Sequence, residues 1–317
     1  MAILVTGAAG FVGNNTVRRL VAQGKQVRAM VRNADKASLR LKDLENKIEI
    51  VSGDVTERST LPPLMRDITA IVHTVAIPME RGDATYDEVN YQGTINLVDA
   101  AEAEGVMRFI NVSQNGATPD HFSRFLRSKG RAQEYVATSK LQWTAVRPSA
   151  IFGQQDEFFN SISRLVSLTP LIFPNIGGGK ATFQPVHIDD VVEAIVRSLD
   201  DAGTIGKEFE LGGPEVLTLE EIEKRIFKAM GTSRALFPAP AGLLKLPVII
   251  MQSTLPGAPV NTTLLELLKV PNVVKENALV TYFKMTPKPF SGDNITYLKQ
   301  NTPGIALKKM FTNATVT

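Results

Sequence analysis

The feature that most constrains the fold is a glycine-rich segment near the start of the chain, Thr6-Gly-Ala-Ala-Gly-Phe-Val-Gly13. It follows the short apolar run Ile3–Val5 directly and leads into Phe11–Ala22, whose apolar residues have helical spacing. A strand, a tight turn and a helix in this order offer a phosphate the positive end of the helix. The segment therefore predicts a dinucleotide-binding unit, and a tight turn without a ligand is the alternative.

The glycines of this segment have separate expected roles. Gly7 permits the tight turn, Gly10 lets a pyrophosphate approach the backbone, and Gly13 lets the helix pack closely on the strand. We expect Phe11 and Val12, which begin the helix, to contact the same cofactor because their backbone lies at the helix start.

Short β-branched runs alternate with helical segments through the first half of the chain. The helical segments include Phe11–Ala22 and Tyr86–Glu104. The runs expected to be strands are Ile3–Thr6, Gln26–Val31, Ile48–Val51, Ala70–Thr74, Arg108–Val112 and Trp143–Arg147. This alternation predicts an α/β protein with a parallel sheet covered on both faces.

The second half has a different character, because connectors rich in Pro and Gly separate its segments. We expect a dinucleotide-binding domain over residues 1–152, with 185–212 returning to it, and a smaller, mostly helical domain over 153–317. Thr218-Leu-Glu-Glu221 has the form of a capping box and predicts a helix start. Asp189 or Asp190 is expected to cap a helix over 191–199.

The end of the second expected strand indicates which dinucleotide is preferred. An acidic residue there would bind a ribose 2′-hydroxyl, but the chain has Arg32, and a guanidinium suits a 2′-phosphate. Lys36 adds a second positive charge nearby. NADP(H) is therefore favoured over NAD(H), which stays the alternative if Arg32 is only a solvated surface arginine.

The composition argues against several other kinds of site and location. The 317 residues include no cysteine, and the net charge is only +3, so neither thiolate metal sites nor nucleic-acid binding is expected. No signal peptide and no run of 18 apolar residues is present, so we expect a cytoplasmic protein, free or peripheral at the inner face of a membrane. The histidines do not form a pair suited to a metal; they are His73, His121 and His187.

Further motifs follow the glycine-rich segment in a fixed order. They are Gly53-Asp54-Val55, Val75-Ala76, Asn90–Asn96, Asn111–Ser113, Arg147-Pro148 with Ile151-Phe-Gly153, and Val186–Asp190. In this order the chain resembles an extended or atypical short-chain dehydrogenase/reductase over nearly its whole length. The resemblance implies a Rossmann doubly wound sheet and a nicotinamide dinucleotide cofactor.

The same resemblance implies positions for the rest of the cofactor site. Asp54, with Val55, matches the family's adenine contact after the third strand, and Val75-Ala76 follows the fourth strand. Pro148 matches the segment that lines the nicotinamide, with Ile151 close behind it. Asn90 is expected to fix local backbone.

The late segments narrow the resemblance to one branch. Phe209–Thr218, Asn272–Leu279 and Phe283…Pro287 are similar to the branch that contains the nucleotide-binding accessory subunit of respiratory complex I. NmrA-like nucleotide-binding proteins are more distant. This branch implies a partner in a larger assembly, with peripheral membrane contact as a further expectation.

One position departs from the family pattern. The family's catalytic Tyr and Lys lie four residues apart on one helix face, where the ammonium lowers the phenol pKa. Here Phe125 replaces the tyrosine before Lys129. Lys129 could still hold the nicotinamide ribose, or be a solvated helix lysine. Ser113 matches the family's active-site serine, or is an ordinary strand-end serine.

Two classes of function follow from these residues. The first is a cofactor-stabilised accessory or docking module of a larger, complex I-like assembly. The second is an NADPH-dependent reductase or isomerase that acts on a small or quinone-like substrate with a proton donor other than tyrosine. Loss of one general acid slows a reaction by about 10²–10⁴-fold without forbidding it, so both classes stay open.

Overall fold

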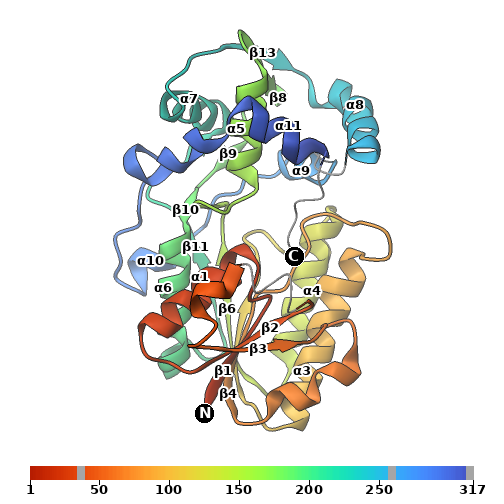
Figure 1. Cartoon of the computed structure of the whole chain (residues 1–317), viewed down its shortest axis with the longest axis vertical. Coiled ribbons are helices and arrows are strands. Elements are labelled where there is room, and N and C mark those ends of the chain that lie inside the picture. Colours follow the sequence, from red (N-terminus) through yellow and green to blue (C-terminus); the bar gives the residue numbers. More distant parts are fainter. Residues whose placement is uncertain (34–39, 256–261, 312–317) are drawn as a thin grey trace. The chain divides into compact units, whose positions relative to one another are not determined.

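The computed structural model of the chain describes residues 1–33, 40–255 and 262–311. The chain divides into two compact units (Figure 1). The first unit comprises Met1–Pro148 and Asp189–Leu211, and the second comprises Ser149–Ile188 and the described chain from Gly212 onward. The chain therefore leaves the first unit once and returns to it for one helix and one strand.

The first unit is built on a seven-stranded sheet in the order β11-β6-β5-β4-β1-β2-β3. All neighbouring strands in this sheet run parallel. The strands are β1 (Ala2–Thr6), β2 (Val27–Val31), β3 (Glu49–Ser52), β4 (Ile68–His73), β5 (Arg108–Val112), β6 (Gln142–Pro148) and β11 (Lys207–Leu211). The order reverses between β1 and β4, which makes the sheet doubly wound.

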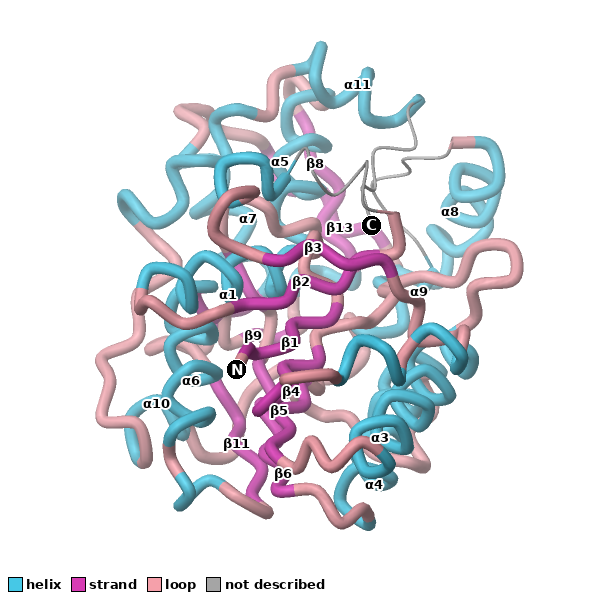
Figure 2. The backbone as a smooth tube through the Cα atoms, turned by 60° about the horizontal axis from the view of Figure 1, so that its bottom comes forward, coloured by secondary structure: helices cyan, strands magenta, loops and turns pink. Residues whose placement is uncertain are grey.

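Helices cover both faces of this sheet. In both overall views α1 (Phe11–Ala22) and α6 (Ile188–Asp200) lie on one face, and α3 (Gly93–Ala103) and α4 (Arg124–Thr138) lie on the other (Figures 1 and 2). Consecutive strand residues are therefore fully buried, as the continuous apolar runs predicted. Examples are Leu4, Val5, Ile71, Val72, Phe109 and Ile110.

The sequence predicted most of this architecture. The α/β class, the parallel sheet and each of the expected strands are confirmed. The expected helix over 86–104 is present, but it opens as a π-helix over Asp87–Gln92 before α3. The expected aspartate cap of α6 was wrong, because the helix already begins at Ile188 and both aspartates lie in its first turn. There their charges complement the helix dipole.

The second unit contains mainly helices and short strand pairs. The pairs are β7 (Ile151–Phe152) with β10 (Val186–His187), β9 (Thr182–Phe183) with β12 (Leu217–Thr218), and β8 (Ile172–Ile176) with β13 (Ala235–Ala239). The helices are α5 (Phe158–Leu168), α7 (Leu219–Ala229), α8 (Ala241–Thr254), α9 (Thr262–Leu267), α10 (Ala278–Thr281) and α11 (Pro303–Phe311). The capping box predicted at Thr218 and Glu221 is present at the start of α7.

Aromatic side chains dominate the core of this second unit. The rings of Phe152, Phe159 and Phe290 contact one another at centroid distances from 4.6 to 6.2 Å. Such contacts add specific geometry to the burial of large apolar surfaces. The unit therefore has a hydrophobic core of its own.

Two negative observations apply to the described part of the chain. No helix there is both long enough and apolar enough to cross a membrane. No three His, Asp or Glu side chains there come close enough together to hold a metal ion.

A very close contact joins the first helix to the first strand. A Cβ atom on Gly13 would lie 2.2 Å from the carbonyl oxygen of Gly7 and 2.8 Å from the hydroxyl of Thr74. Gly13 therefore cannot be replaced by a larger residue unless α1 moves away from β1.

We therefore expect Gly13→Ala to lower the free energy of unfolding by about 1–3 kcal/mol, through overpacking. Gly304→Ala is the matched control, since a Cβ there meets no atom within 4 Å and alanine favours a helix. Urea unfolding of both variants measures the difference. Equal stability of Gly13→Ala and the unchanged protein would contradict the close contact.

Candidate functional site

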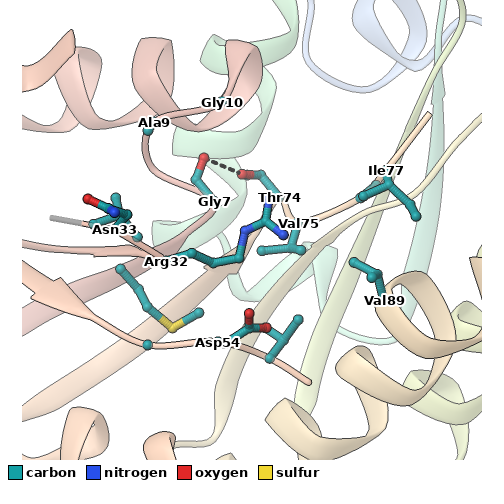
Figure 3. Close-up of a pocket in the computed structure, with 15 residues that line it drawn as sticks. Gly7, Ala9, Gly10, Arg32, Asn33, Asp54, Thr74, Val75, Ile77 and Val89 are labelled. Atoms are coloured by element: carbon teal, nitrogen blue, oxygen red, sulfur yellow. Dashed lines mark hydrogen bonds between the residues drawn. The ribbon is translucent and has the colours of Figure 1, made fainter. Parts of the chain in front are cut away.

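A pocket lies at the carboxyl ends of β1 and β4, where the strand order reverses. This is the place where doubly wound folds bind ligands. The pocket has a cavity volume of about 110 Å³. Its lining includes Gly7, Ala9, Gly10, Arg32, Asn33, Asp54, Val55, Thr74, Val75, Ala76, Ile77 and Val89 (Figure 3). The fold thus brings together seven of the residues predicted to bind the cofactor: Gly7, Gly10, Arg32, Asp54, Val55, Val75 and Ala76.

The glycine-rich turn forms the wall of this pocket at the start of α1. Gly7 has a φ of +69°, which favours glycine, and the N–H of Gly10 donates to its carbonyl at 2.8 Å. No side chain caps α1. The first-turn N–H groups of Phe11, Val12 and Gly13 therefore lack a helical acceptor, and the arrangement fits an anionic pyrophosphate.

Polar side chains at the ends of β2 and β3 form another part of the pocket. The Arg32 side chain extends into the pocket (Figure 3), and no carboxylate among the described residues forms an ion pair with it. One carboxylate oxygen of Asp54 accepts hydrogen bonds from the N–H and the hydroxyl of Thr56, both at 2.9 Å, so the carboxylate is held in a fixed orientation. Lys36 lies outside the described residues.

Arg40 is a cation beside the glycine-rich turn that the sequence analysis missed. Its Nη1 donates to the carbonyl oxygen of Ala9 at 2.8 Å. Its backbone carbonyl accepts from Arg18 at 2.9 Å and from Asn14 at 3.3 Å, which ties it to α1. Only the folded chain shows that Arg40 contacts the glycine-rich turn, because eight positions separate it from Arg32 in the sequence.

A chain of buried hydrogen bonds begins beneath the glycine-rich turn. The ring of His73, at the end of β4, lies 2.8 Å from the hydroxyl of Thr6 through Nδ1 and 3.1 Å from the hydroxyl of Thr94 through Nε2. Thr94 donates its own proton to the carbonyl of Asn90. Nε2 must therefore carry the ring proton, and Nδ1 accepts from Thr6. Burial lowers the pKa of His73 to about 3, so the ring is neutral.

The same chain continues to the helix that carries Phe125. The amide of Asn90 accepts from the N–H of Ile77 at 2.8 Å and donates to the hydroxyl of Ser128 at 3.2 Å. Ser128 in turn donates to the carbonyl of Phe125 at 2.8 Å. Asn90 thus fixes local backbone, as the sequence predicted.

Phe125 packs on apolar side chains at the edge of this pocket. It contacts a cluster formed by Ile77, Tyr86 and Val89, two of which line the pocket. Its ring meets the ring of Tyr86 edge-on at 5.7 Å. The phenol of Tyr86 donates to the carbonyl of Pro78 at 3.1 Å, so this hydroxyl already has an acceptor.

Lys129 lies one helical turn after Phe125 and is buried rather than solvated. Its ammonium donates to the carbonyl of Val112 at 2.8 Å, at the end of β5. Burial lowers the pKa of Lys129 to about 8. Ser113, which follows Val112 in the chain, is also buried. Its hydroxyl has no hydrogen-bond partner among the described residues. Buried groups with spare donor capacity fit a ligand that carries hydroxyl or amide groups.

The other predicted residues lie outside the pocket lining. Phe11, Val12 and Gly13 form the first turn of α1, where backbone rather than side chains would meet a phosphate. Pro148 ends β6 in the first unit. Ile151 belongs to β7 in the second unit.

The buried charge of Lys129 predicts a specific pH dependence of stability. The folded protein releases this proton near pH 8, whereas the unfolded chain holds it up to about pH 10.5. Raising the pH across this window therefore stabilises the folded state, by up to about 3 kcal/mol. We expect the free energy of unfolding of Lys129→Met to exceed that of the unchanged protein by the largest amount at pH 7. This difference should shrink toward pH 10.

Urea unfolding at pH 7, 8.5 and 10 measures this difference. The control is Lys228→Met, which removes an exposed lysine and should show no such trend. A stability difference for Lys129→Met that stays constant with pH would show that Lys129 does not titrate in this window.

Comparison with known proteins agrees with this geometry. Residues 7–164 match the NAD(P)H-binding family. NADH dehydrogenase (ubiquinone) 1 alpha subcomplex subunit 9 of Arabidopsis thaliana is 32% identical over 70% of this chain, and the match spans 56% of that protein. Photosystem II assembly factor Ycf39 of Guillardia theta is 30% identical over 77% of this chain and 75% of its own length. Ceramide reductase of Caulobacter vibrioides is 28% identical over 61% of this chain and 59% of its own length.

A solved structure shares the fold over nearly the whole chain. The dTDP-glucose 4,6-dehydratase of Streptomyces venezuelae, solved with NAD bound, has a TM-score of 0.72 at 20% identity and covers 95% of this chain and 96% of its own. The chain is thus an NAD(P)H-binding protein of the family that contains photosystem II assembly factor Ycf39, and it is also similar to NADH dehydrogenase (ubiquinone) 1 alpha subcomplex subunit 9.

Proposed function

We propose that the protein is an NADP(H)-binding accessory module that holds its cofactor without turning it over and docks onto a larger assembly. The observation that carries this proposal is Phe125, a phenyl ring one helical turn before Lys129 and beside the pocket. A bound nicotinamide would supply hydride chemistry, but a carbonyl substrate also needs a proton donor, and a phenyl ring has no proton to give.

Most of the neighbouring polar groups are not available as a replacement acid, with Lys129 as the exception. The phenol of Tyr86 donates to Pro78, the hydroxyl of Ser128 donates to the backbone of Phe125, and His73 is neutral and deeply buried. Lys129 donates one of its three protons to a backbone carbonyl, so it is the group that the reductase alternative would use as its acid. Of these described groups only the hydroxyl of Ser113 is without a partner, and a lone serine is a weak acid.

Two arginines support a preference for NADP(H). Arg32 replaces the carboxylate that would bind a 2′-hydroxyl, and it lies in the pocket. Arg40 contacts the glycine-rich turn through the carbonyl of Ala9, so it places a second guanidinium next to that turn. Bidentate pairing of a guanidinium with a phosphate is a strong, charge-assisted contact. NAD(H) is the alternative, because related folds are solved with NAD.

A nucleotide that does not react still has a physical role. A ligand held at about a thousand times its dissociation constant adds about 4 kcal/mol to stability. The pocket joins the glycine-rich turn to the ends of β2, β3 and β4, so binding there would stabilise the whole sheet. Two relatives support an accessory role, because one is named as a subunit of NADH dehydrogenase and the other as an assembly factor of photosystem II.

A second candidate is an NADPH-dependent reductase that obtains its proton elsewhere. The ceramide reductase relative favours this candidate, as do Lys129 and Ser113, which keep the family's positions. The tests below separate it from the accessory module.

The cofactor preference is tested by Arg32→Asp, which removes a cation and adds a charge that repels a 2′-phosphate. We expect at least a tenfold loss of NADPH affinity, equivalent to about 1.4 kcal/mol, and little change for NADH. Calorimetric titration measures both, with Arg66→Asp, an exposed site that does not line the pocket, as the charge-matched control. Equal losses for the two nucleotides would remove Arg32 from the 2′-phosphate site.

The missing acid is tested by Phe125→Tyr, which adds a hydroxyl within one helical turn of Lys129 at little steric cost. We expect the unchanged protein to show no turnover of simple carbonyls or sugar nucleotides with NADPH, and the variant to gain at most weak carbonyl reduction. Phe122→Tyr, on an exposed ring, is the control. Robust turnover by the unchanged protein would overturn the accessory-module proposal.

A further inference from the structure

A second pocket lies within the second unit and shares no lining residue with the nucleotide pocket. Its volume is about 210 Å³, which exceeds the roughly 150 Å³ of an engineered apolar cavity that binds benzene. Elements α5, β8, α7 and α8 contribute to its wall, together with residues in and just after α9. Most lining side chains are apolar, for example Leu165, Phe173, Val248, Met251 and Leu264.

One ionisable side chain, Glu223, interrupts this apolar lining. It lies on the buried face of α7, four residues after Leu219 and four before Phe227. The residue is only 2% exposed, and its Oε2 has no hydrogen-bond partner among the described residues. A buried polar atom without a partner costs about 1–3 kcal/mol, so its presence in an apolar wall calls for an explanation.

Glu223 is a hydrogen-bond donor in this environment. Burial, with a smaller effect of the charge on Glu220, raises the pKa of Glu223 to about 8. At neutral pH the carboxyl group is therefore mainly protonated and carries an O–H. Among the described lining residues the other polar side chain is Ser161, which already accepts from Arg164 at 2.6 Å.

We propose that this pocket binds an uncharged, largely apolar small molecule, about one ring with a short substituent in size, that places a hydrogen-bond acceptor such as a carbonyl oxygen against Glu223. The apolar walls provide affinity by removing hydrocarbon from water, and the single donor orients the ligand. A cationic ligand fits less well, because burying an ion pair in apolar surroundings costs the solvation of both charges. The site is independent of the nucleotide pocket and of whether the protein turns over its cofactor.

Two probes of similar shape test the proposal on the full chain. Acetophenone carries a carbonyl oxygen, and cumene has a methyl group in its place. Because one neutral hydrogen bond contributes about 0.5–1.5 kcal/mol, we expect the unchanged protein to bind acetophenone up to roughly tenfold more tightly than cumene. Ligand-observed NMR measures both affinities, and saturating NADPH should leave them unchanged.

Variants of Glu223 locate the donor. Glu223→Gln keeps an N–H donor and should keep the preference for acetophenone. Glu223→Leu should lose the preference for acetophenone and bind cumene at least as tightly, because the carbonyl oxygen then has no donor. The variant should still fold, because it removes a buried polar atom without a partner. Leu264→Phe fills part of the pocket and should lower the affinity for both probes. Urea unfolding checks that each variant is folded.

The proposal would be overturned by any of three results. These are binding of neither probe to the unchanged protein, a preference for acetophenone that survives in Glu223→Leu, and competition between either probe and NADPH. The last result would place the probes in the nucleotide pocket. None of these outcomes bears on the accessory-module proposal, which depends on the nucleotide site alone.

Discussion

The close packing of α1 on β1 determines the geometry of the first unit. Gly13 allows it, because any side chain there would meet the carbonyl oxygen of Gly7. The contact fixes the start of α1 at the reversal point of the sheet, where the glycine-rich turn lines the pocket together with the ends of β2, β3 and β4. One steric constraint therefore positions the glycine-rich turn against the strand ends that line the pocket.

The buried hydrogen bonds extend that constraint toward the position where a reductase would do chemistry. From Thr6 through His73, Thr94 and Asn90 to Ser128, each polar group finds a partner. A connected and satisfied network of this kind gives a unique geometry in a low-dielectric interior. It ends at the backbone of Phe125, whose side chain contributes packing and no acid. The proposed accessory role rests on this point, because a nicotinamide bound here would have the family's polar framework beside it and a phenyl ring at the position of the expected proton donor.

Features encoded by local patterns could be predicted from the sequence. The strands, the glycine-rich turn and the capping box at Thr218 follow from residues close together in the chain. The end of the second strand located Arg32, and the family resemblance supplied Asp54 and Val75. Features that depend on distant contacts could not be predicted. Arg40 reaches Ala9 only in the folded chain, and His73 gives no sequence sign of its two threonine partners. Glu223 lies in a charge-rich stretch that resembles a solvated helix face until the phase of α7 buries it.

The most direct test of the central claim mixes the purified protein with one equivalent of NADPH and a panel of quinones and carbonyls. Absorbance of the reduced nicotinamide is followed for hours, and the unfolding midpoint is measured in parallel. The account predicts constant absorbance together with a raised midpoint, since the nucleotide binds and stabilises the protein without reacting. Stoichiometric loss of the absorbance with reduction of any acceptor would contradict it.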